Sequence, residues 1–270
     1  MKAYSEGLRS DSKRIALVPT MGSLHKGHLS LVASAKRNGD VSVVSIFVNP
    51  SQFGPKEDYA TYPRALEKDL RALRRLGVDV VFTPTSEEMY PEGFETYVEV
   101  CELQRRLCGI SRPGHFRGVA TVVLKLFNIV KPHAAVFGEK DYQQLRIIKK
   151  MVRDLALDID IIAAPTVREE NGLAMSSRNR YLSDEDKSRA LGIPRALMEI
   201  KREFENGTRD AKRLIAIGKE LLKEHELNRV DYLNICDRET LEDKAWAEKG
   251  DVVAIALDVG SARLIDNMTL

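Results

Sequence analysis

The sequence is poor in cysteine, aromatic residues and long apolar runs, and it carries almost no excess charge. Its three cysteines are Cys101, Cys108 and Cys236, and an odd number at irregular spacing is not a disulfide framework. The 42 Lys and Arg residues nearly balance the 40 Asp and Glu residues, which argues against a nucleic-acid backbone as the main partner. No apolar run reaches the roughly 18 residues of a membrane span. The polar segment from Met1 to Lys13 lacks the apolar centre of a signal peptide, so we expect a cytoplasmic protein with reduced thiols.

The chain is long enough to bury a large hydrophobic core. Its 270 residues exceed the roughly 100–200 residues of a typical domain. Hydrophobic residues make up 43% and charged residues 30%, as in an ordinary globular protein. We therefore expect two domains or one large domain that folds without a disulfide or metal staple.

The first 165 residues alternate short apolar runs with amphipathic stretches. Runs rich in Val, Ile and Phe predict buried strands at residues 15–19, 41–49, 78–82 and 134–138. The stretches between and after them predict helices at residues 27–37, 62–76, 119–130 and 141–157. Alternating strands and helices form parallel sheets, and ligands bind beyond the carboxyl ends of such strands.

The remainder of the chain has a different pattern. Charged amphipathic helices are predicted at residues 183–206 and 209–227, followed by strands at residues 230–236 and 252–258. The predicted fold class is therefore α/β, with a Rossmann-like parallel-sheet domain at residues 1–165. A smaller α+β domain is expected at residues 166–270.

The segment PTMGSLHKGH, at residues 19–28, carries the first chemical signal. His25 and His28 flank Gly27 where the first predicted strand gives way to the first predicted helix. Free N–H groups at a helix N-terminus favour an anion, and imidazole can donate to phosphate oxygens. The plainer interpretation is a pair of capping or core histidines. The position between a strand and a helix favours the phosphate site.

Polar residues also follow two other predicted strands. A turn at Asn49 and Pro50 precedes Gln52, whose amide can bond a hydroxyl and a carboxylate, although an ordinary surface amide would fit the local pattern equally. Lys140 lies at a predicted helix start, where its ammonium can reach a phosphate. Asp141 is open to another interpretation, as a cap of that helix.

Two loops complete the candidate segments. Ser176, Ser177 and Arg178, with Gly172 nearby, suit a loop that grips phosphate, although a plain linker leading into a helix capped by Ser183 is the alternative. The stretch RPGHFRGVATVV, at residues 112–123, approaches a helix with basic residues that could face a substrate. Taken alone, His115 is better explained as a structural residue.

These blocks together resemble the pantothenate synthetase family. The pattern His25-x-Gly27-His28 is similar to that of the nucleotide-transferring enzymes that include class I aminoacyl-tRNA synthetases. The strings SIFVNPSQFG, FGEKDYQQL and AMSSRNRYLS are similar to pantothenate synthetases in particular. The resemblance covers nearly the whole chain, most densely at residues 18–66 and 112–183.

The resemblance implies a reaction, its ligands and its site residues. Pantoate would react with ATP to give pantoyl adenylate, and β-alanine would then release AMP and pantothenate, with Mg²⁺ accompanying ATP. A homodimer is implied, and no protein ligand of Mg²⁺ can be named. The implied catalytic residues are His25, His28, Lys140 and Arg178, with His28 as proton donor or charge stabiliser. The implied pantoate ligands are Gln52 and Gln144, and Val167 is expected to touch adenine. The implied ATP-binding residues are Met21, Gly22, Ser23, Leu24, His25, Lys26, Gly27, His28, Gly138, Glu139, Lys140, Asp141, Val167, Met175, Ser176, Ser177 and Arg178.

Two alternatives stay open on the sequence. Another nucleotidyltransferase of the same fold would share the two histidines but would not need Gln52 and Gln144 in these strings. An ATP-binding sensor without turnover would bind ATP and release no pyrophosphate.

Overall fold

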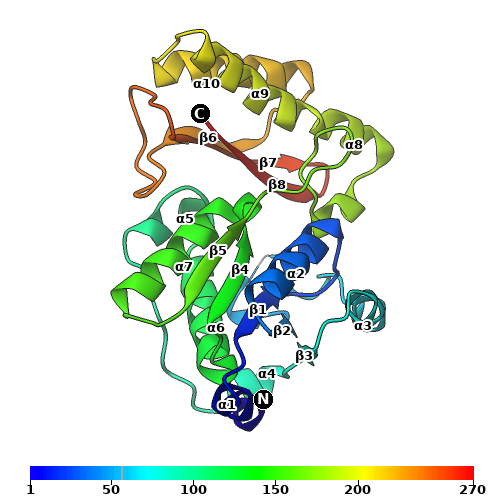
Figure 1. Cartoon of the computed structure of the whole chain (residues 1–270). Coiled ribbons are helices and arrows are strands. Elements are labelled where there is room, and N and C mark those ends of the chain that lie inside the picture. Colours follow the sequence, from blue (N-terminus) through cyan, green and yellow to red (C-terminus); the bar gives the residue numbers. More distant parts are fainter. Residues whose placement is uncertain (56) are drawn as a thin grey trace. The chain divides into compact units, whose positions relative to one another are not determined.

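The computed structural model describes residues 1–55 and 57–270, which form two compact units (Figure 1). Unit 1 comprises residues 1–104, 112–139 and 144–165. Unit 2 comprises residues 105–111, 140–143 and 166–270. The main division therefore follows Pro165, and two short segments from earlier in the chain belong to the second unit.

Unit 1 contains a five-stranded parallel sheet in the order β3-β2-β1-β4-β5. The strands are β1 (Ile15–Thr20), β2 (Val41–Ile46), β3 (Val80–Phe82), β4 (Ala134–Gly138) and β5 (Asp160–Ala164). The apolar runs form these central strands because both faces of the sheet are covered, and β1 is fully buried from Ile15 to Val18. The predicted Rossmann-like sheet is confirmed.

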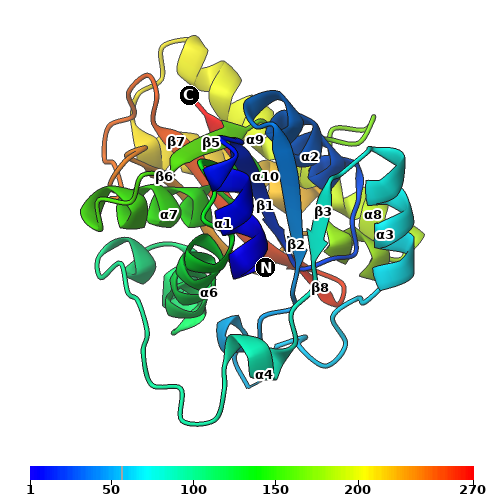
Figure 2. The same cartoon turned by 60° about the horizontal axis from the view of Figure 1, so that its bottom comes forward.

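Helices cover both faces of this sheet. Figure 2 shows α2 (Lys26–Asn38) and α3 (Leu66–Arg75) on one face, and α6 (His115–Val130) and α7 (Tyr142–Asp154) on the other. Unit 1 also contains α1 (Lys2–Ser10), α4 (Ser86–Met89) and the 3-10 helix η1 (Pro50–Gln52). Val32 and Ala35 of α2 pack into a core with Val18, Val44 and Val136 of the strands.

The strand order reverses between β1 and β4, which pair through Ala16 with Ala134 and Leu17 with Ala135. Such a reversal separates the two loops that follow the strands and is where α/β sheets bind ligands. The segment at residues 21–28 follows β1. The 3-10 helix η3 (Glu139–Asp141) follows β4.

Unit 2 contains an antiparallel sheet in the order β6-β7-β8, formed by β6 (Val230–Cys236), β7 (Val252–Val259) and β8 (Ala262–Thr269). Helices α9 (Gly192–Glu205) and α10 (Ala211–Glu224) pack on it (Figure 1). Leu197, Leu214 and Ile255 are fully buried in their shared core. The remaining elements are α5 (Cys108–Ser111), α8 (Asp184–Ala190) and η4 (Ser177–Tyr181). The residues of η2 (Leu103–Arg105) are divided between the two units. The predicted α+β character of this part is confirmed.

The structure differs from the expected elements in two ways. The sequence did not predict α1, β5 or β8. In β8 the apolar residues are interrupted by charged and amide side chains such as Asp266 and Asn267, and β5 has only four apolar residues after Asp160. The helix expected at residues 183–206 is broken into α8 and α9. Pro194 explains the break, because it has no N–H to donate to the carbonyl of Ala190.

No helix within residues 1–55 and 57–270 combines the length and the apolar character that crossing a membrane requires.

Candidate active site

The two motif histidines form the N-terminal cap of α2. His25 is the N-cap residue, and its Nδ1 accepts a hydrogen bond from the Gly27 N–H at 3.2 Å. Nδ1 of His28 accepts from the His25 N–H at 3.4 Å, and the ring centroids lie 4.1 Å apart. A neutral imidazole that accepts at Nδ1 carries its proton on Nε2. Each ring can therefore donate from Nε2 while Nδ1 shapes the helix end, so capping and chemistry are compatible.

A buried carboxylate holds the loop that leads into this cap. Asp69 of α3 is 2% exposed, and its two oxygens accept from the Ser23 N–H at 2.7 Å and the Leu24 N–H at 2.8 Å. The loop turns sharply here, since Gly22 has φ 80° and Ser23 has φ 52°. The sequence analysis missed Asp69. The predicted ATP contacts of Ser23 and Leu24 stay a prediction, and the backbone N–H groups of both residues bind this protein carboxylate.

Gln52 lies on η1, where other side chains hold its amide. Asn49 donates from Nδ2 to Oε1 of Gln52 at 3.1 Å, and Nε2 of Gln52 lies 3.0 Å from the Met21 sulfur. Gln52 is 8% exposed and Asn49 is 1% exposed, so this is not an ordinary surface amide. The structure thus brings together Met21 and Gln52, which the sequence assigned to ATP and pantoate separately.

Asn49 in turn is held by hydroxyl groups. Its Oδ1 accepts from Tyr90 Oη at 2.8 Å and from Ser51 Oγ at 2.9 Å. Burial raises the pKa of Tyr90, so its phenol stays protonated and donates at neutral pH. The residue that orients Gln52 is therefore itself fixed in one amide orientation, because Oδ1 faces donors and Nδ2 faces acceptors.

The residues after β4 have different roles in the structure. Gly138 ends the strand, and the Lys140 carbonyl accepts from Asn267 Nδ2 at 2.9 Å. The Lys140 ammonium lies 3.8 Å from the Asp141 carboxylate. Glu139 and Asp141 belong to η3 together with Lys140. Within unit 2, the Lys140 backbone is thereby anchored on β8.

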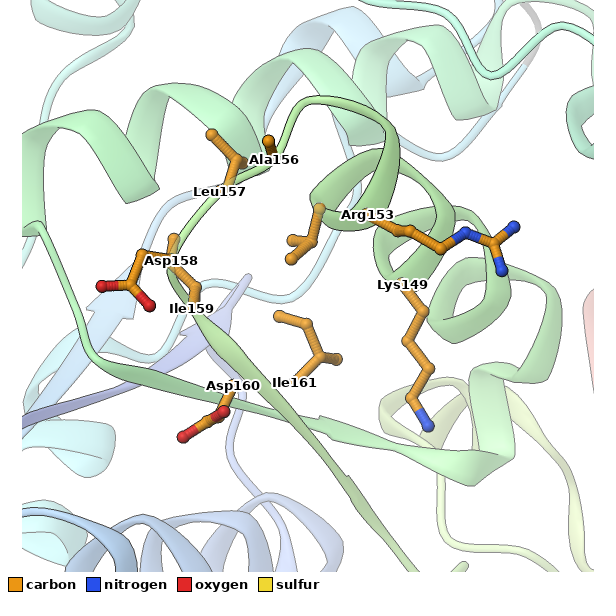
Figure 3. Close-up of a pocket in the computed structure, with 9 residues that line it drawn as sticks. Lys149, Arg153, Ala156, Leu157, Asp158, Ile159, Asp160 and Ile161 are labelled. Carbon is orange, nitrogen blue, oxygen red and sulfur yellow. The ribbon is translucent and has the colours of Figure 1, made fainter.

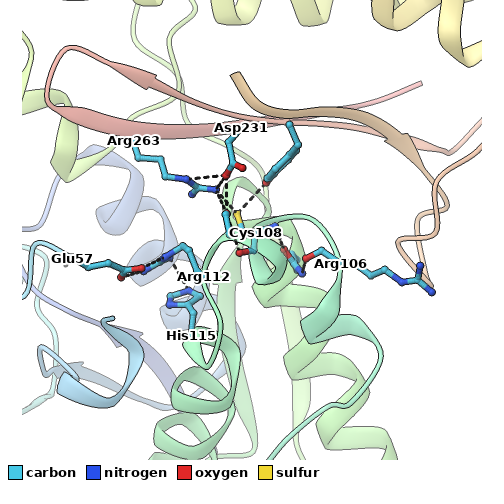
Figure 4. Close-up of polar contacts among 10 residues, drawn as sticks. Glu57, Arg106, Cys108, Arg112, His115, Asp231 and Arg263 are labelled. Atoms are coloured by element: carbon cyan, nitrogen blue, oxygen red, sulfur yellow. Dashed lines mark hydrogen bonds and ion pairs between the residues drawn. The ribbon is translucent and has the colours of Figure 1, made fainter. Parts of the chain in front are cut away.

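The two consecutive glutamines at the start of α7 differ in their burial. Gln143 is buried, and it accepts from the Cys108 N–H at 3.0 Å and donates to the Arg106 carbonyl at 2.6 Å (Figure 4). Gln144 is only half-buried. Gln143 therefore serves the structure of unit 2, and the role of Gln144 as a pantoate ligand stays a prediction.

The serine-rich loop of unit 2 begins as a hairpin. Val167 accepts from the Met175 N–H at 3.0 Å, and Gly172 turns the chain with φ 90°. Ser176 caps η4 by accepting from the Arg178 N–H at 3.2 Å, and Ser177 is buried beside it.

An ion pair ties this hairpin to the sheet of unit 2. Arg168 donates to both oxygens of Asp266 at 2.7 and 3.0 Å, and Asp266 is 3% exposed. A forked, buried pair of this kind fixes orientation well. The sequence analysis missed it because Arg168 and Asp266 lie 98 residues apart.

Within residues 1–55 and 57–270, no group of three or more His, Cys, Asp or Glu side chains is arranged to hold a metal ion. A shallow hollow of about 600 Å³ lies elsewhere in unit 1 (Figure 3). Lys149, Arg153, Asp158 and Asp160 line it with apolar residues of α7 and β5. None of the lining residues belongs to the predicted site.

The fold and the histidine-capped helix after β1 define a nucleotide-binding α/β protein. The sequence matches the family described as Pantoate-beta-alanine ligase over residues 1–269. The chain belongs to this family. It is an ATP-dependent ligase, and its reaction joins pantoate to β-alanine.

Individual relatives agree with this assignment. The chain is 53% identical over 270 residues to the pantothenate synthetase of Thermosipho africanus, covering all of this chain and 97% of that protein. A solved pantothenate synthetase structure from Thermus thermophilus has a TM-score of 0.94 at 47% identity, covering 98% of this chain and 97% of that one. The pantoate–β-alanine ligase of Francisella tularensis, solved with Beta-gamma ATP and β-alanine, has a TM-score of 0.80 at 37% identity, covering 99% of this chain and 95% of that one.

Proposed function

We propose that this enzyme joins pantoate and β-alanine in two steps through a pantoyl adenylate. In the first step, a pantoate carboxylate oxygen attacks the α-phosphorus of ATP and pyrophosphate leaves. In the second, the amine of β-alanine attacks the acyl carbon, loses a proton and displaces AMP, which gives pantothenate. AMP is a good leaving group, so the reaction needs positioning and charge neutralisation rather than a protein nucleophile.

The cap of α2 carries this proposal. Two neutral imidazoles that accept backbone N–H groups at Nδ1 present Nε2–H donors at the positive end of a 13-residue helix. We assign His25 and His28 to the triphosphate, with His28 stabilising the negative charge that develops on the phosphates. Met21, Gly22, Ser23, Leu24, Lys26 and Gly27 form the surrounding ATP-binding segment.

The other phosphate ligands come from the segments after β4 and β5. Lys140 and Arg178 would neutralise phosphate charge, and the hydroxyls of Ser176 and Ser177 would donate to phosphate oxygens. Gly138, Glu139, Asp141, Val167 and Met175 would complete the nucleotide site, with Val167 against adenine. Gln52 and Gln144 would bind pantoate.

Magnesium is proposed as part of the nucleotide substrate. Mg²⁺ keeps several waters and commonly binds through phosphates with one or two carboxylates. It would enter with ATP and neutralise phosphate charge, while the residues named above orient the triphosphate. We further propose that the enzyme is a cytoplasmic homodimer, which size-exclusion chromatography with light scattering would test for its oligomeric state.

The decisive experiment measures pyrophosphate release from Mg·ATP with pantoate, with and without β-alanine. Pantoate alone should give a single-turnover burst of pyrophosphate, because the adenylate stays on the enzyme. Pantoate and β-alanine together should give sustained release of pyrophosphate, with AMP and pantothenate formed in equal amounts. ATP binding without release would support a sensor, and turnover with another phosphate-bearing substrate would support a different nucleotidyltransferase.

A further inference from the structure

The basic stretch between β3 and β4 lies beside Gln52 and does not stand open to substrate. Arg112 donates from Nε to one oxygen of Glu57 at 2.8 Å and from Nη2 to the other at 2.5 Å. Its remaining Nη1 lies 3.0 Å from Nε2 of His115. Nδ1 of His115 lies 2.7 Å from the carbonyl oxygen of Gln52. Figure 4 shows Glu57, Arg112 and His115 in this sequence of contacts.

The chemistry of these groups fixes the direction of every hydrogen bond. A guanidinium can only donate, so Nε2 of His115 must accept. A carbonyl can only accept, so Nδ1 of His115 must carry the proton. His115 is thus neutral with its proton on Nδ1. A chain of hydrogen bonds runs from Arg112 through His115 to the backbone of Gln52. A second proton on His115 would set two donors against each other at Arg112.

Glu57 anchors this chain at its far end. The side chains of Arg112 and Glu57 are 16% and 25% exposed, so the pair is shielded from water. Burial alone would raise the pKa of Glu57, but hydrogen bonds and charge from Arg112 outweigh it and hold that pKa below its usual value. Glu57 therefore stays ionised and keeps the guanidinium fork in place, which leaves Nη1 aimed at His115.

The backbone of Gln52 also packs against the next turn of α6, the helix that begins with His115. Gly118 packs so closely on η1 that a Cβ there would lie 2.2 Å from the Ser51 oxygen and 2.7 Å from the Gln52 nitrogen. The Gly118 carbonyl accepts from Asn49 Nδ2, which also donates to the Gln52 side chain. A displacement of the Gln52 backbone would therefore also break the hydrogen bonds that orient its amide.

We propose that Glu57, Arg112 and His115 are positioning residues that hold Gln52 in the orientation that binds pantoate. This inference rests on the proposed role of Gln52 as a pantoate ligand. It gives the basic stretch a function other than direct substrate binding, because the Arg112 charge is already paired with Glu57. A positioning chain of this kind should affect the substrate that Gln52 binds and leave the nucleotide unaffected.

The test compares Michaelis constants for pantoate and ATP in variants of the full-length enzyme. His115→Phe keeps a ring beside Phe116 but removes both hydrogen bonds. It should raise KM for pantoate about tenfold, with KM for ATP changed less than about twofold. Glu57→Gln should raise KM for pantoate by about threefold. The double variant should be no worse than His115→Phe, because the two residues act along one chain.

Two further variants make the result decisive. His133→Phe is the matched control, since His133 accepts the Ile15 N–H in the same unit at the opposite end of β1. It should leave both Michaelis constants unchanged. Gln52→Leu tests the proposed ligand directly and should raise KM for pantoate at least as much as His115→Phe.

The outcomes separate the proposals. A rise with Gln52→Leu but none with His115→Phe or Glu57→Gln would overturn the positioning chain and leave the proposed function intact. Equal rises in both Michaelis constants would mark a general structural defect and would also overturn it. No effect of Gln52→Leu would remove the role of Gln52 and the positioning chain with it. If His115→Phe fails to fold by circular dichroism, Glu57→Gln decides, because it removes the anchor and preserves the ring.

Discussion

Single side chains in this enzyme divide their atoms between structure and chemistry. In His28, Nδ1 completes the capping box of α2, and Nε2 carries the proton that a phosphate can accept. A substitution that keeps the acceptor in place of Nδ1 but removes the Nε2 donor can therefore distinguish the structural role from the chemical one.

His28→Asn and His28→Ala should differ in stability but not in activity. Asn retains an acceptor near the position of Nδ1 and loses the Nε2 donor, whereas Ala loses both. Each should slow pyrophosphate release about 100-fold or more, the scale of losing a donor to a charged transition state. Only His28→Ala should also lower the free energy of unfolding, by about 0.5–2 kcal/mol for a lost cap. Single-turnover rates and urea unfolding measure the two effects, and a rate within threefold of the parent for either variant would contradict the role of His28.

His133 should give the fold a dependence on pH. Its Nδ1 accepts the Ile15 N–H at 3.0 Å. Burial lowers the pKa of His133 below 6.5, and the charges of Arg9 and Arg14 lower it further. The unfolded chain therefore takes up a proton at a higher pH than the folded protein does. Stability should fall as pH falls through about 6.5 and continue falling until the folded pKa is reached.

Urea unfolding at several pH values checks this against His133→Asn, which keeps an acceptor for Ile15 but does not titrate. The parent should lose more stability than the variant between about pH 7.5 and 5.5. Parallel losses in the two proteins would show that other groups cause the dependence.

At the scale of elements, the contact between α6 and η1 decides where Gln52 lies. Gly118→Ala would place a methyl group 2.2 Å from the Ser51 carbonyl oxygen, so the two elements must separate. We expect a loss of about 1–3 kcal/mol in the free energy of unfolding, together with a higher KM for pantoate. Gly7→Ala in α1 is the matched control, because nothing lies within 4 Å of its Cβ position. It should stabilise the protein by about 0.5–1 kcal/mol, and a similar loss in both variants would contradict the argument.

The sequence predicted the strands and helices whose buried residues follow a regular pattern along a short stretch of the chain. β1 and β4 are continuous apolar runs, so their composition alone identifies them. β8 alternates buried residues with partly exposed ones, and one of the buried residues is Asp266, whose charge is paired with Arg168 from far along the chain. The histidines and Gln52 were proposed from local sequence motifs. Asp69 and His115 could not be assigned, since their partners come from other elements.

At the scale of the molecule, the chain does not divide into two continuous stretches. Residues 105–111 and 140–143 belong to unit 2 although most of their neighbours in sequence belong to unit 1. Within unit 2, the Cys108 sulfur lies 3.0 Å from Tyr232 Oη. Ser111 donates to Asp231 at 2.8 Å, and Arg263 pairs with the same carboxylate (Figure 4). The stretch expected to form the second domain, residues 166–270, therefore lacks part of its own packing.

A fragment of residues 166–270 should fold around its own core but with lower stability than this unit has in the full chain. Its helices α9 and α10 keep their packing on the sheet, so its circular dichroism should remain that of a mixed α and β structure. Tyr232 is the sensitive reporter, because burial and the neighbouring Cys108 raise its pKa well above 10.0 in the full chain. Without residues 105–111, the phenol loses Cys108 and the cover that this segment gives, and its pKa should fall towards the ordinary value.

Ultraviolet titration of phenolate measures this, with Tyr232→Phe in the fragment and in the full chain to identify the Tyr232 signal. Tyr181 is the other tyrosine of the fragment and serves as the internal comparison. A folded fragment in which Tyr232 still resists ionisation would show that the two short segments are not needed to bury it. An unfolded fragment would show that their contribution is larger, since the core of α9, α10 and the three strands would then be insufficient to hold the fold. A folded fragment with an ordinary Tyr232 pKa is the expected result. The fragment keeps the core between its helices and its sheet, but it lacks the segment that supplies Cys108.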